Sequence, residues 1–115
     1  MFTKDYTPEG KISKELFEFK FLLHPLRLAI MKSLSDNPQL TTTDLKNLLN
    51  ISWTELSNHL KALKKKGYIL TESKFIDNSV KVAITIEPNG LSAFHSLGDL
   101  LAEFFDQANY TNYLE

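Results

Sequence analysis

Hydrophobic residues recur three or four positions apart along most of residues 12–66, a spacing that is typical of amphipathic helices. The pattern predicts four helices, over 12–23, over 25–35, from a cap at Thr41 or Thr42 to Leu49, and over 52–66. Pro25 suits the first turn of the second helix, and Asp36-Asn37-Pro38 predicts its end. The first part of the chain is therefore predicted to be helical.

The fourth of these helices carries signals at both ends. Ser52 and Glu55 have the spacing of a capping box, in which each side chain accepts a hydrogen bond from the other residue's backbone N–H. Gly67 is the residue preferred just past a helix C-terminus, because it adopts the left-handed conformation without strain. Three lysines at 64–66 fill the last turn, where cations interact favourably with the helix dipole.

Beyond Gly67 the hydrophobic period changes to two, which indicates strands. Strands are predicted from Tyr68 to Phe75 and from Val80 to Ile86, joined by a hairpin at Asp77-Asn78 and followed by a helix over 88–108. The predicted fold class is α+β, mainly α. One domain is expected for 1–115, with terminal helices at 12–23 and 88–108 and a core at 25–86.

Length and composition are ordinary for a globular protein, with 115 residues of which 43% are hydrophobic. The chain has no cysteine, which excludes disulfides and thiolate metal sites and is consistent with a reducing compartment. The N-terminus lacks the basic-then-apolar order of a signal peptide, and no apolar run approaches the roughly 20 residues of a membrane span. A cytoplasmic protein without a membrane anchor is expected.

The net charge of −1 hides an uneven distribution. Residues 61–81 hold six lysines and two acidic residues, whereas residues 87–115 hold five acidic residues and no lysine or arginine. Nucleic-acid binding depends on where positive charge lies and not on its sum. We therefore expect any contact with a nucleic acid to involve the basic middle of the chain.

The predicted helix over 52–66 has a buried stripe and a polar outer face. Leu56, Leu60 and Leu63 share one side of the helix. The opposite side holds hydroxyl, amide and ammonium groups, at Thr54, Ser57, Asn58, Lys61 and Lys65. Hydroxyl and amide groups can read base edges and lysines can bind phosphates, so this inventory suits a helix in the major groove. A merely solvated face would have the same composition, and both interpretations stay open at this point.

Four runs of sequence carry a family resemblance. They are His24-Pro25-Leu26-Arg27-Leu28-Ala29-Ile30, Thr43-Asp44-Leu45, Leu56-Ser57-Asn58-His59-Leu60-Lys61-Ala62-Leu63 and Lys66-Gly67-Tyr68-Ile69. Together they resemble winged helix-turn-helix transcriptional regulators, closest to the small single-domain group related to the multiple-antibiotic-resistance (MarR) and arsenical-resistance (ArsR) repressors. The resemblance covers residues 24 to about 97. It implies a winged helix-turn-helix fold in which helix 52–66 is the recognition helix and the two-stranded hairpin is the wing.

The resemblance also implies which residues meet DNA. Ser57, Asn58 and Lys61 are expected to face the groove, and His59 to lie near the backbone. The wing departs from the family pattern, because its tip at 75–79 lacks arginine and only Lys74 and Lys81 flank it. The predicted DNA-contacting set is Thr54, Ser57, Asn58, Lys61, Lys64, Lys65, Lys74 and Lys81.

No metal or cofactor site is expected. The cysteines that bind metal in many ArsR relatives are absent. His24, His59 and His95 are too far apart in the sequence to indicate a metal site by their spacing, and structural roles are expected for them. No glycine-rich phosphate loop or nucleophile–base spacing is present, so an enzyme is not expected.

The two terminal helices are more apolar than a small three-helix core requires. Nearly half the circumference of helix 88–108 is apolar, and Gly98 would allow another backbone to approach. The helix over 12–23 adds apolar residues on one side, Ile12, Leu16, Phe19 and Leu23. These helices are predicted to form a homodimer interface, which would place two recognition helices on a palindrome-like site. Packing within one chain is the alternative.

The function expected from these observations is sequence-specific binding of double-stranded DNA by a homodimeric transcriptional regulator. The alternative is a winged helix that binds another protein and makes no direct contact with DNA. A small apolar effector is a further partner to consider, since Phe17, Phe21, Phe94 and Phe105 would be available to line a pocket between the terminal helices. Core packing is the simpler explanation for aromatic residues at helical spacing.

Overall fold

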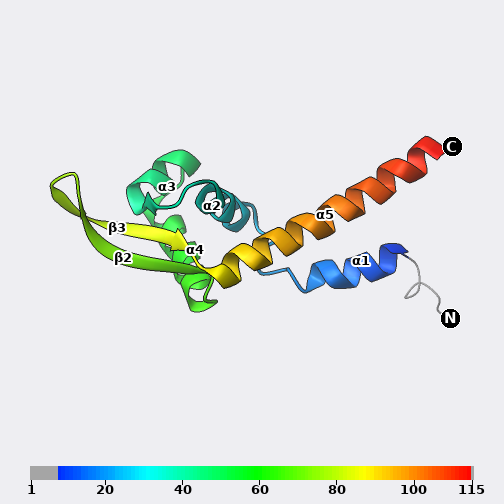
Figure 1. Ribbon diagram of the computed structural model, residues 1–115, viewed down its shortest axis with the longest axis horizontal. Helices are drawn as coiled ribbons and strands as arrows, with labels where there is room; N and C mark the ends of the chain where they lie inside the picture. The colour runs from blue at the N-terminus through cyan, green and yellow to red at the C-terminus, as the bar shows by residue number, and fades with distance from the viewer. Residues whose placement is uncertain (1–7, 115) are drawn as a thin grey trace.

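The computed structural model describes the backbone of residues 8–114 and the side chains of residue 10 and residues 13–106. Its elements in chain order are α1 (Pro8–Phe17), α2 (Pro25–Asp36), β1 (Leu40–Thr41), α3 (Thr42–Leu49), α4 (Trp53–Lys65), β2 (Ile69–Ile76), β3 (Ser79–Ile86) and α5 (Pro88–Leu114) (Figure 1). The predicted order of four helices, two strands and a last helix is confirmed, with one short strand added. None of the helices in this part of the chain is long and apolar enough to cross a bilayer.

The structure consists of a body and an arm (Figure 1). The body is formed by α2, α3, α4 and the sheet, and the β2–β3 hairpin projects from one end of it. The arm is formed by α5, which leaves the body toward the other end, and by α1, which packs beside α5. Since α5 has 27 residues, a rise of about 1.5 Å per residue makes it about 40 Å long.

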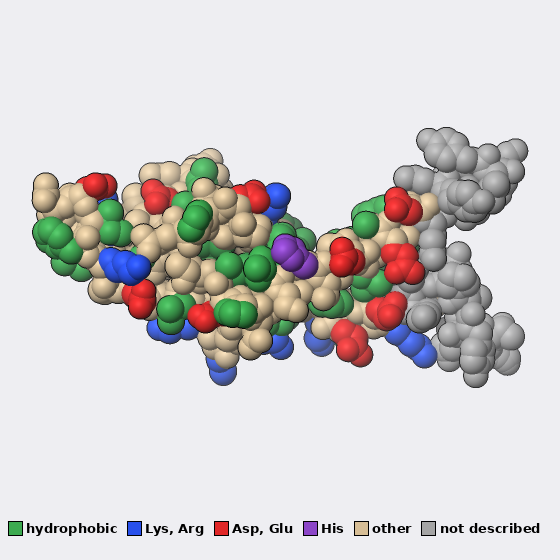
Figure 2. Space-filling view, in the orientation of Figure 1, with side chains coloured by type: hydrophobic (Ala, Val, Ile, Leu, Met, Phe, Trp, Pro, Cys, Tyr) green, Lys and Arg blue, Asp and Glu red, His purple; other side chains and the backbone are tan. Residues whose placement is uncertain are grey.

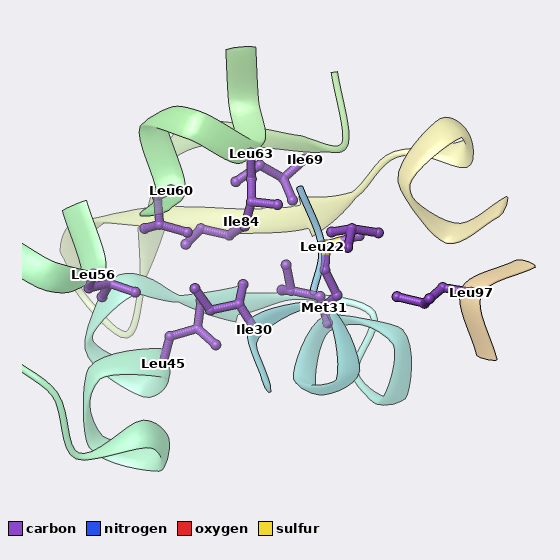
Figure 3. Close-up of a cluster of buried hydrophobic side chains, with 11 residues drawn as sticks. Leu22, Ile30, Met31, Leu45, Leu56, Leu60, Leu63, Ile69, Ile84 and Leu97 are labelled. Atoms are coloured by element: carbon purple, nitrogen blue, oxygen red, sulfur yellow. The ribbon is translucent and has the colours of Figure 1, made fainter. Parts of the chain in front are cut away.

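One hydrophobic core joins the body to the first turns of the arm (Figure 3). Every helix of the body and the sheet contribute buried side chains, among them Ile30, Met31, Leu45, Leu56, Leu63 and Ile84. Leu22 from the α1–α2 linker and Leu97 from α5 extend this cluster toward the arm. Full burial of one such side chain stabilises the fold by about 1.5–3 kcal/mol, so this core fixes α4 against the other helices.

The predicted ends of α4 are confirmed. Ser52 Oγ accepts a hydrogen bond from the backbone N of Glu55 at 3.1 Å, and Glu55 Oε1 accepts one from the backbone N of Ser52 at 3.4 Å. Gly67 follows the helix with φ of 81°, in the left-handed region. The N-cap of α3 is Thr41, the first of the two predicted candidates, and it forms a second capping box with Asp44. These local signals set where α3 and α4 begin.

The sheet is antiparallel with strand order β1-β3-β2. The predicted hairpin is confirmed, and both turn residues, Asp77 and Asn78, have positive φ, as a tight two-residue turn between twisted strands requires. The third strand, β1, was not predicted, because its two residues are too short for a periodic pattern. The residues that pair across the hairpin include Lys74 with Lys81 and Phe75 with Val80.

The prediction of a helix over 12–23 is wrong at both ends. The helix spans Pro8–Phe17, and residues 18–22 form turns. In these turns Phe19 N bonds to Leu16 O at 2.9 Å and Leu22 N bonds to Phe19 O at 2.9 Å, so the backbone tightens from the α-helical to the three-residue spacing. The tightening turns Leu22 into the core, where it is buried. The side chain of Ile12 lies outside the described residues.

The end of α5 also differs from the prediction. The predicted helix stops at residue 108, whereas α5 continues to Leu114. No glycine or proline follows Gly98 to end the helix. The start of α5, in contrast, is tightly fixed: Glu87 N donates to Tyr68 O at 2.9 Å, and buried Gly90 packs against the backbone of the same tyrosine.

Candidate nucleic-acid interface

The outer face of α4 carries the polar residues that were predicted to meet DNA. Leu56, Leu60 and Leu63 point into the core and are at most 8% exposed. The residues on the opposite side are all exposed, namely Thr54, Ser57, Asn58, Lys61 and Lys65. The order along the helix is hydroxyl and amide groups in the first turns and ammonium groups further on. This order matches a helix that reads bases near its N-terminus and holds phosphates along its length.

The lysines of α4 are exposed and available to an external anion. Among the residues that the structure describes, Lys61, Lys64 and Lys65 form no ion pair. Figure 2 shows several Lys and Arg side chains along the lower edge of the body among scattered acidic ones, while Asp and Glu side chains predominate on the arm. The uneven charge distribution along the sequence therefore becomes a bias in space, with a basic edge on the body and an excess of acidic residues on the arm.

The two wing lysines are less available than those of α4. The Lys74 ammonium donates to Gln39 Oε1 at 2.8 Å and lies 3.6 Å from a Glu72 carboxylate oxygen. Lys81 is half-buried and sits opposite Lys74 on the same face of the hairpin. The structure thus brings the predicted pair together, but the charge of Lys74 is already balanced within the chain.

The wing tip is apolar on its other face. Phe75 and Val80 pair across the two strands and are 73% and 71% exposed. They continue the face of the sheet that holds Ile69 and Ile84 in the core, at a point where no helix covers it. The wing therefore combines an apolar tip with a nearly neutral stem.

A groove of about 320 Å³ lies between α4 and the wing. Its floor is apolar, with Leu56 and Leu60, and its rim is formed by Trp53, Ser57, Lys61, Lys64, Thr42 and Thr71. The Trp53 ring is 52% exposed, and the Lys46 ammonium lies 5.4 Å from its centroid. Trp53 therefore lies at the rim of the groove and is not part of the core. Sequence reasoning missed this groove because it depends on how far the wing stands from α4.

The other flank of α4 packs on the start of α2 through a cluster of cationic and aromatic side chains. The rings of His24 and His59 lie 4.5 Å apart between centroids, and Arg27 Nε donates to His59 Nδ1 at 3.2 Å. Arg27 also donates to the carbonyl oxygen of Phe21 at 3.0 Å, with its guanidinium 4.3 Å from the centroid of that ring. No pattern along the chain indicates this contact, because 35 positions separate the two histidines. His95 stays apart on α5, where it neighbours Phe94.

The environment of His59 disfavours its charged form. Partial burial, followed by the neighbouring His24 and Arg27, lowers the pKa of the His59 imidazole, and Glu55 opposes this shift. His59 therefore packs against α2, which agrees with the structural role expected for it, and its lowered pKa favours the neutral ring. No cluster of three or more potential metal ligands occurs within the described residues.

The four phenylalanines considered for an effector pocket do not share one cavity. Phe17 and Phe105 are 66% and 57% exposed on the arm. Phe21 packs edge-on against Tyr68, with 6.0 Å between ring centroids. Phe94 lines a cavity of about 300 Å³ between α2 and α5, without the other three. The helices place these rings in three different surroundings, which helical spacing along the sequence does not reveal.

Comparisons with known proteins agree with this geometry. The family model for the winged helix DNA-binding domain matches residues 26–105. The transcriptional regulator homologue of Pyrococcus horikoshii OT3 has a TM-score of 0.79 at 20% sequence identity, over 85% of this chain and 97% of that chain. MepR of S. aureus in its DNA complex has a TM-score of 0.67 at 20% sequence identity, over 90% of this chain and 87% of that chain.

A third solved structure, HlyU from Vibrio cholerae N16961, has a TM-score of 0.59 at 26% sequence identity, over 80% of this chain and 96% of that chain. Among the curated proteins, none matches this sequence. The expected winged helix-turn-helix fold is confirmed by the family model and by these structures.

Proposed function

We propose that this chain, which belongs to the family of winged helix DNA-binding domains, regulates transcription by inserting α4 into the major groove of double-stranded DNA. The family is one of DNA-binding domains and not of enzymes. The observation that carries the proposal is the outer face of α4, with exposed Ser57 and Asn58 in its first turns and exposed Lys61 and Lys65 beyond them. A DNA-binding regulator acts where the chromosome is, so the proposal includes a cytoplasmic location.

Sequence specificity is assigned to the first turns of α4. An amide such as that of Asn58 can pair with adenine in two hydrogen bonds, and such a contact discriminates between bases by about 1–3 kcal/mol. Thr54 and Ser57 supply hydroxyl groups beside it. Lys61, Lys64 and Lys65 then neutralise phosphates, while Lys74 and Lys81 act only as secondary contacts because the wing stem is nearly neutral.

A homodimer is part of the proposal. The arm exposes Phe17 and Phe105, and Leu23 at the end of the linker is 40% exposed. Large apolar side chains grouped away from the basic face suit association with a second copy through the arms. Two copies joined in this way would present two α4 helices to one duplex. MepR, a protein of similar fold, is in complex with DNA in its solved structure.

The alternative, a winged helix that binds only another protein, requires an apolar surface where α4 is polar. Exposed large apolar side chains occur on the wing, on the arm and its linker, and also at Leu48 of α3 and Trp53 at the first position of α4. The outward face of α4 itself, from Thr54 to Lys65, is hydrophilic. This distribution favours DNA as the partner of α4. We place any apolar effector in the cavity between α2 and α5, beside Phe94 and Leu28, and not in a pocket between the four phenylalanines.

The proposal is tested by the salt dependence of DNA binding. Fluorescence anisotropy of a labelled mixed-sequence duplex is measured over a range of salt for the wild type and for Lys61→Ala/Lys65→Ala. Since each phosphate contact contributes about 0.9 to the slope of log Kobs against log salt, the double variant is expected to bind more weakly and with a slope shallower by about 2.

Lys32→Ala is the matched control. Lys32 is an exposed lysine of α2 that pairs with Asp36 at 3.3 Å, on the body but not on α4. Its removal should leave affinity and slope unchanged. Recognition by α4 is wrong if the wild type does not bind duplex DNA at low salt, or if the double variant keeps the wild-type slope.

A further inference from the structure

The two stacked imidazoles beside α4 have defined tautomers. His24 is the N-cap of α2, and its Nδ1 accepts a hydrogen bond from the backbone N of Leu26 at 3.1 Å. His59 Nδ1 accepts from Arg27 Nε at 3.2 Å. A neutral imidazole that accepts at Nδ1 carries its proton on Nε2. Both rings therefore present an Nε2–H donor, and neither donor has an acceptor among the described residues.

The charges around the pair are predominantly positive. From α2 come the Arg27 guanidinium and the positive end of the helix dipole. From α4 come Lys66, whose ammonium lies 5.3 Å from the Phe21 ring centroid, and Glu55. The Glu55 carboxylate accepts hydrogen bonds from Ser52 in the capping box, so it is already engaged. Within the part of the chain that the structure describes, no carboxylate pairs with Arg27.

The cluster is placed on the flank of α4 that is not occupied by the wing. Trp53, Ser57 and Lys61 line the wing groove on one flank, and His59 contacts α2 on the other. A helix in the major groove has a sugar–phosphate strand on each side. The histidine flank therefore lies beside one of these two strands when α4 reads bases.

We propose that His24 and His59 together bind one phosphate of the DNA backbone through their Nε2–H groups, beside the recognition helix. Two donors on rings 4.5 Å apart between centroids, with a nearby guanidinium, suit the two charge-bearing oxygens of a phosphodiester. The site rests on the proposed function, because only a docked α4 brings a phosphate to this flank.

The site couples DNA binding to proton uptake. In the free protein the pKa of His59 is lowered, so the ring is neutral at pH 7.5. A bound phosphate favours the imidazolium and so raises the pKa of His59 in the complex. The proton taken up from solvent goes to Nδ1, which then releases the Arg27 Nε–H that it accepts in the free protein and leaves that donor to the same phosphate. Affinity must therefore increase as the pH falls from 7.5 to 6.0, and a rise of about one pKa unit corresponds to a change of up to about tenfold.

The test measures duplex affinity by anisotropy at pH 6.0 and pH 7.5 and constant ionic strength. The wild type is expected to bind about twofold to fivefold more tightly at pH 6.0, because only part of the limiting tenfold change falls between the two pH values. His59→Gln keeps an N–H donor at a similar position but cannot titrate, so its affinity should be the same at both pH values. His24→Asn, which preserves the helix cap, should reduce the pH dependence as well. His95→Gln, on the arm, should behave as the wild type.

Two results would overturn the site while leaving the proposed function intact: a wild-type affinity that does not change with pH, or a pH dependence that persists in both His59→Gln and His24→Asn. If no form binds duplex DNA at either pH, the proposed function fails and the site is tested with inorganic phosphate alone. In that case an increase in the imidazole pKa of His59, followed by NMR, supports the anion site, and an unchanged pKa overturns it.

Discussion

At the scale of single residues, two glycines of α5 have opposite surroundings. A Cβ on buried Gly90 would overlap the carbonyl group of Tyr68, whereas a Cβ on exposed Gly98 would meet nothing within 4 Å. An interior glycine costs a helix about 1 kcal/mol relative to alanine. Substitutions at Gly90 and Gly98 therefore separate the effect of packing from the effect of helix propensity within one helix.

We expect Gly90→Ala to lower the free energy of unfolding by about 1–3 kcal/mol, because the added methyl group must displace backbone at the start of β2. Gly98→Ala should raise it by up to about 1 kcal/mol. Urea denaturation followed by circular dichroism measures both changes. Equal stability of Gly90→Ala and the wild type would show that the contact with Tyr68 is not tight.

At the scale of elements, α4 depends on a few local interactions to start at the right residue. The capping box of Ser52 and Glu55 satisfies backbone N–H groups that would otherwise lack a partner. The buried leucines then hold the helix against α2 and α3. The position of Ser57 and Asn58 on the outer face follows from this starting point.

Ser52→Ala is expected to reduce the free energy of unfolding by about 1 kcal/mol, because the N-cap acceptor is lost. Ser92→Ala is the control, since Ser92 is an exposed residue inside α5 where alanine is a good helix former. Both values come from urea denaturation curves. A loss of stability in Ser92→Ala as large as in Ser52→Ala would contradict a specific role for the cap.

In these elements the sequence predicts well the features that depend on residues close together in the chain. The cap at Ser52, the left-handed Gly67 and the turn at Asp77-Asn78 are each set by interactions a few positions apart. The tightened end of α1 was missed because it serves the burial of Leu22, a contact made across the fold. β1 was missed because two residues give no period.

The candidate site likewise has features that the sequence predicts and features that it does not. The outer face of α4 follows from helical geometry, so its exposed residues were predicted correctly in position. The contact between His24 and His59 joins two helices, and the groove beside Trp53 joins a helix to a hairpin. Neither is encoded by spacing along the chain. The engagement of Lys74 by Gln39 is a third contact of this kind.

At the scale of the whole molecule, exposed aromatic side chains lie at opposite ends. Phe75 is at the wing tip, and Phe105 is on the arm, with exposed fractions of 73% and 57%. The acidic side chains of the arm lie away from the basic edge of the body (Figure 2). If the arms hold two copies together, only the aromatic residues at that end contribute to association.

Phe105→Glu is expected to weaken self-association by about thirtyfold or more, since an aromatic side chain at the centre of an interface contributes about 2 kcal/mol or more. Analytical ultracentrifugation over a range of protein concentrations measures this change. Phe75→Glu introduces the same charge at a similarly exposed phenylalanine and should leave association unchanged. A wild type that sediments as a monomer at all concentrations would exclude the homodimer.

The junction between β3 and α5 has a consequence for how related chains diverge. Only Glu87 separates Ile86 from Pro88, and Gly90 is packed on Tyr68. One residue inserted after Gly90 would rotate the rest of α5 by about 100° and advance it by about 1.5 Å. A change of length in the turn between β2 and β3, in contrast, would leave the direction of α5 unchanged. In the proposed homodimer, chains with the same α4 but a different length in this interval would therefore require different distances between their DNA half-sites.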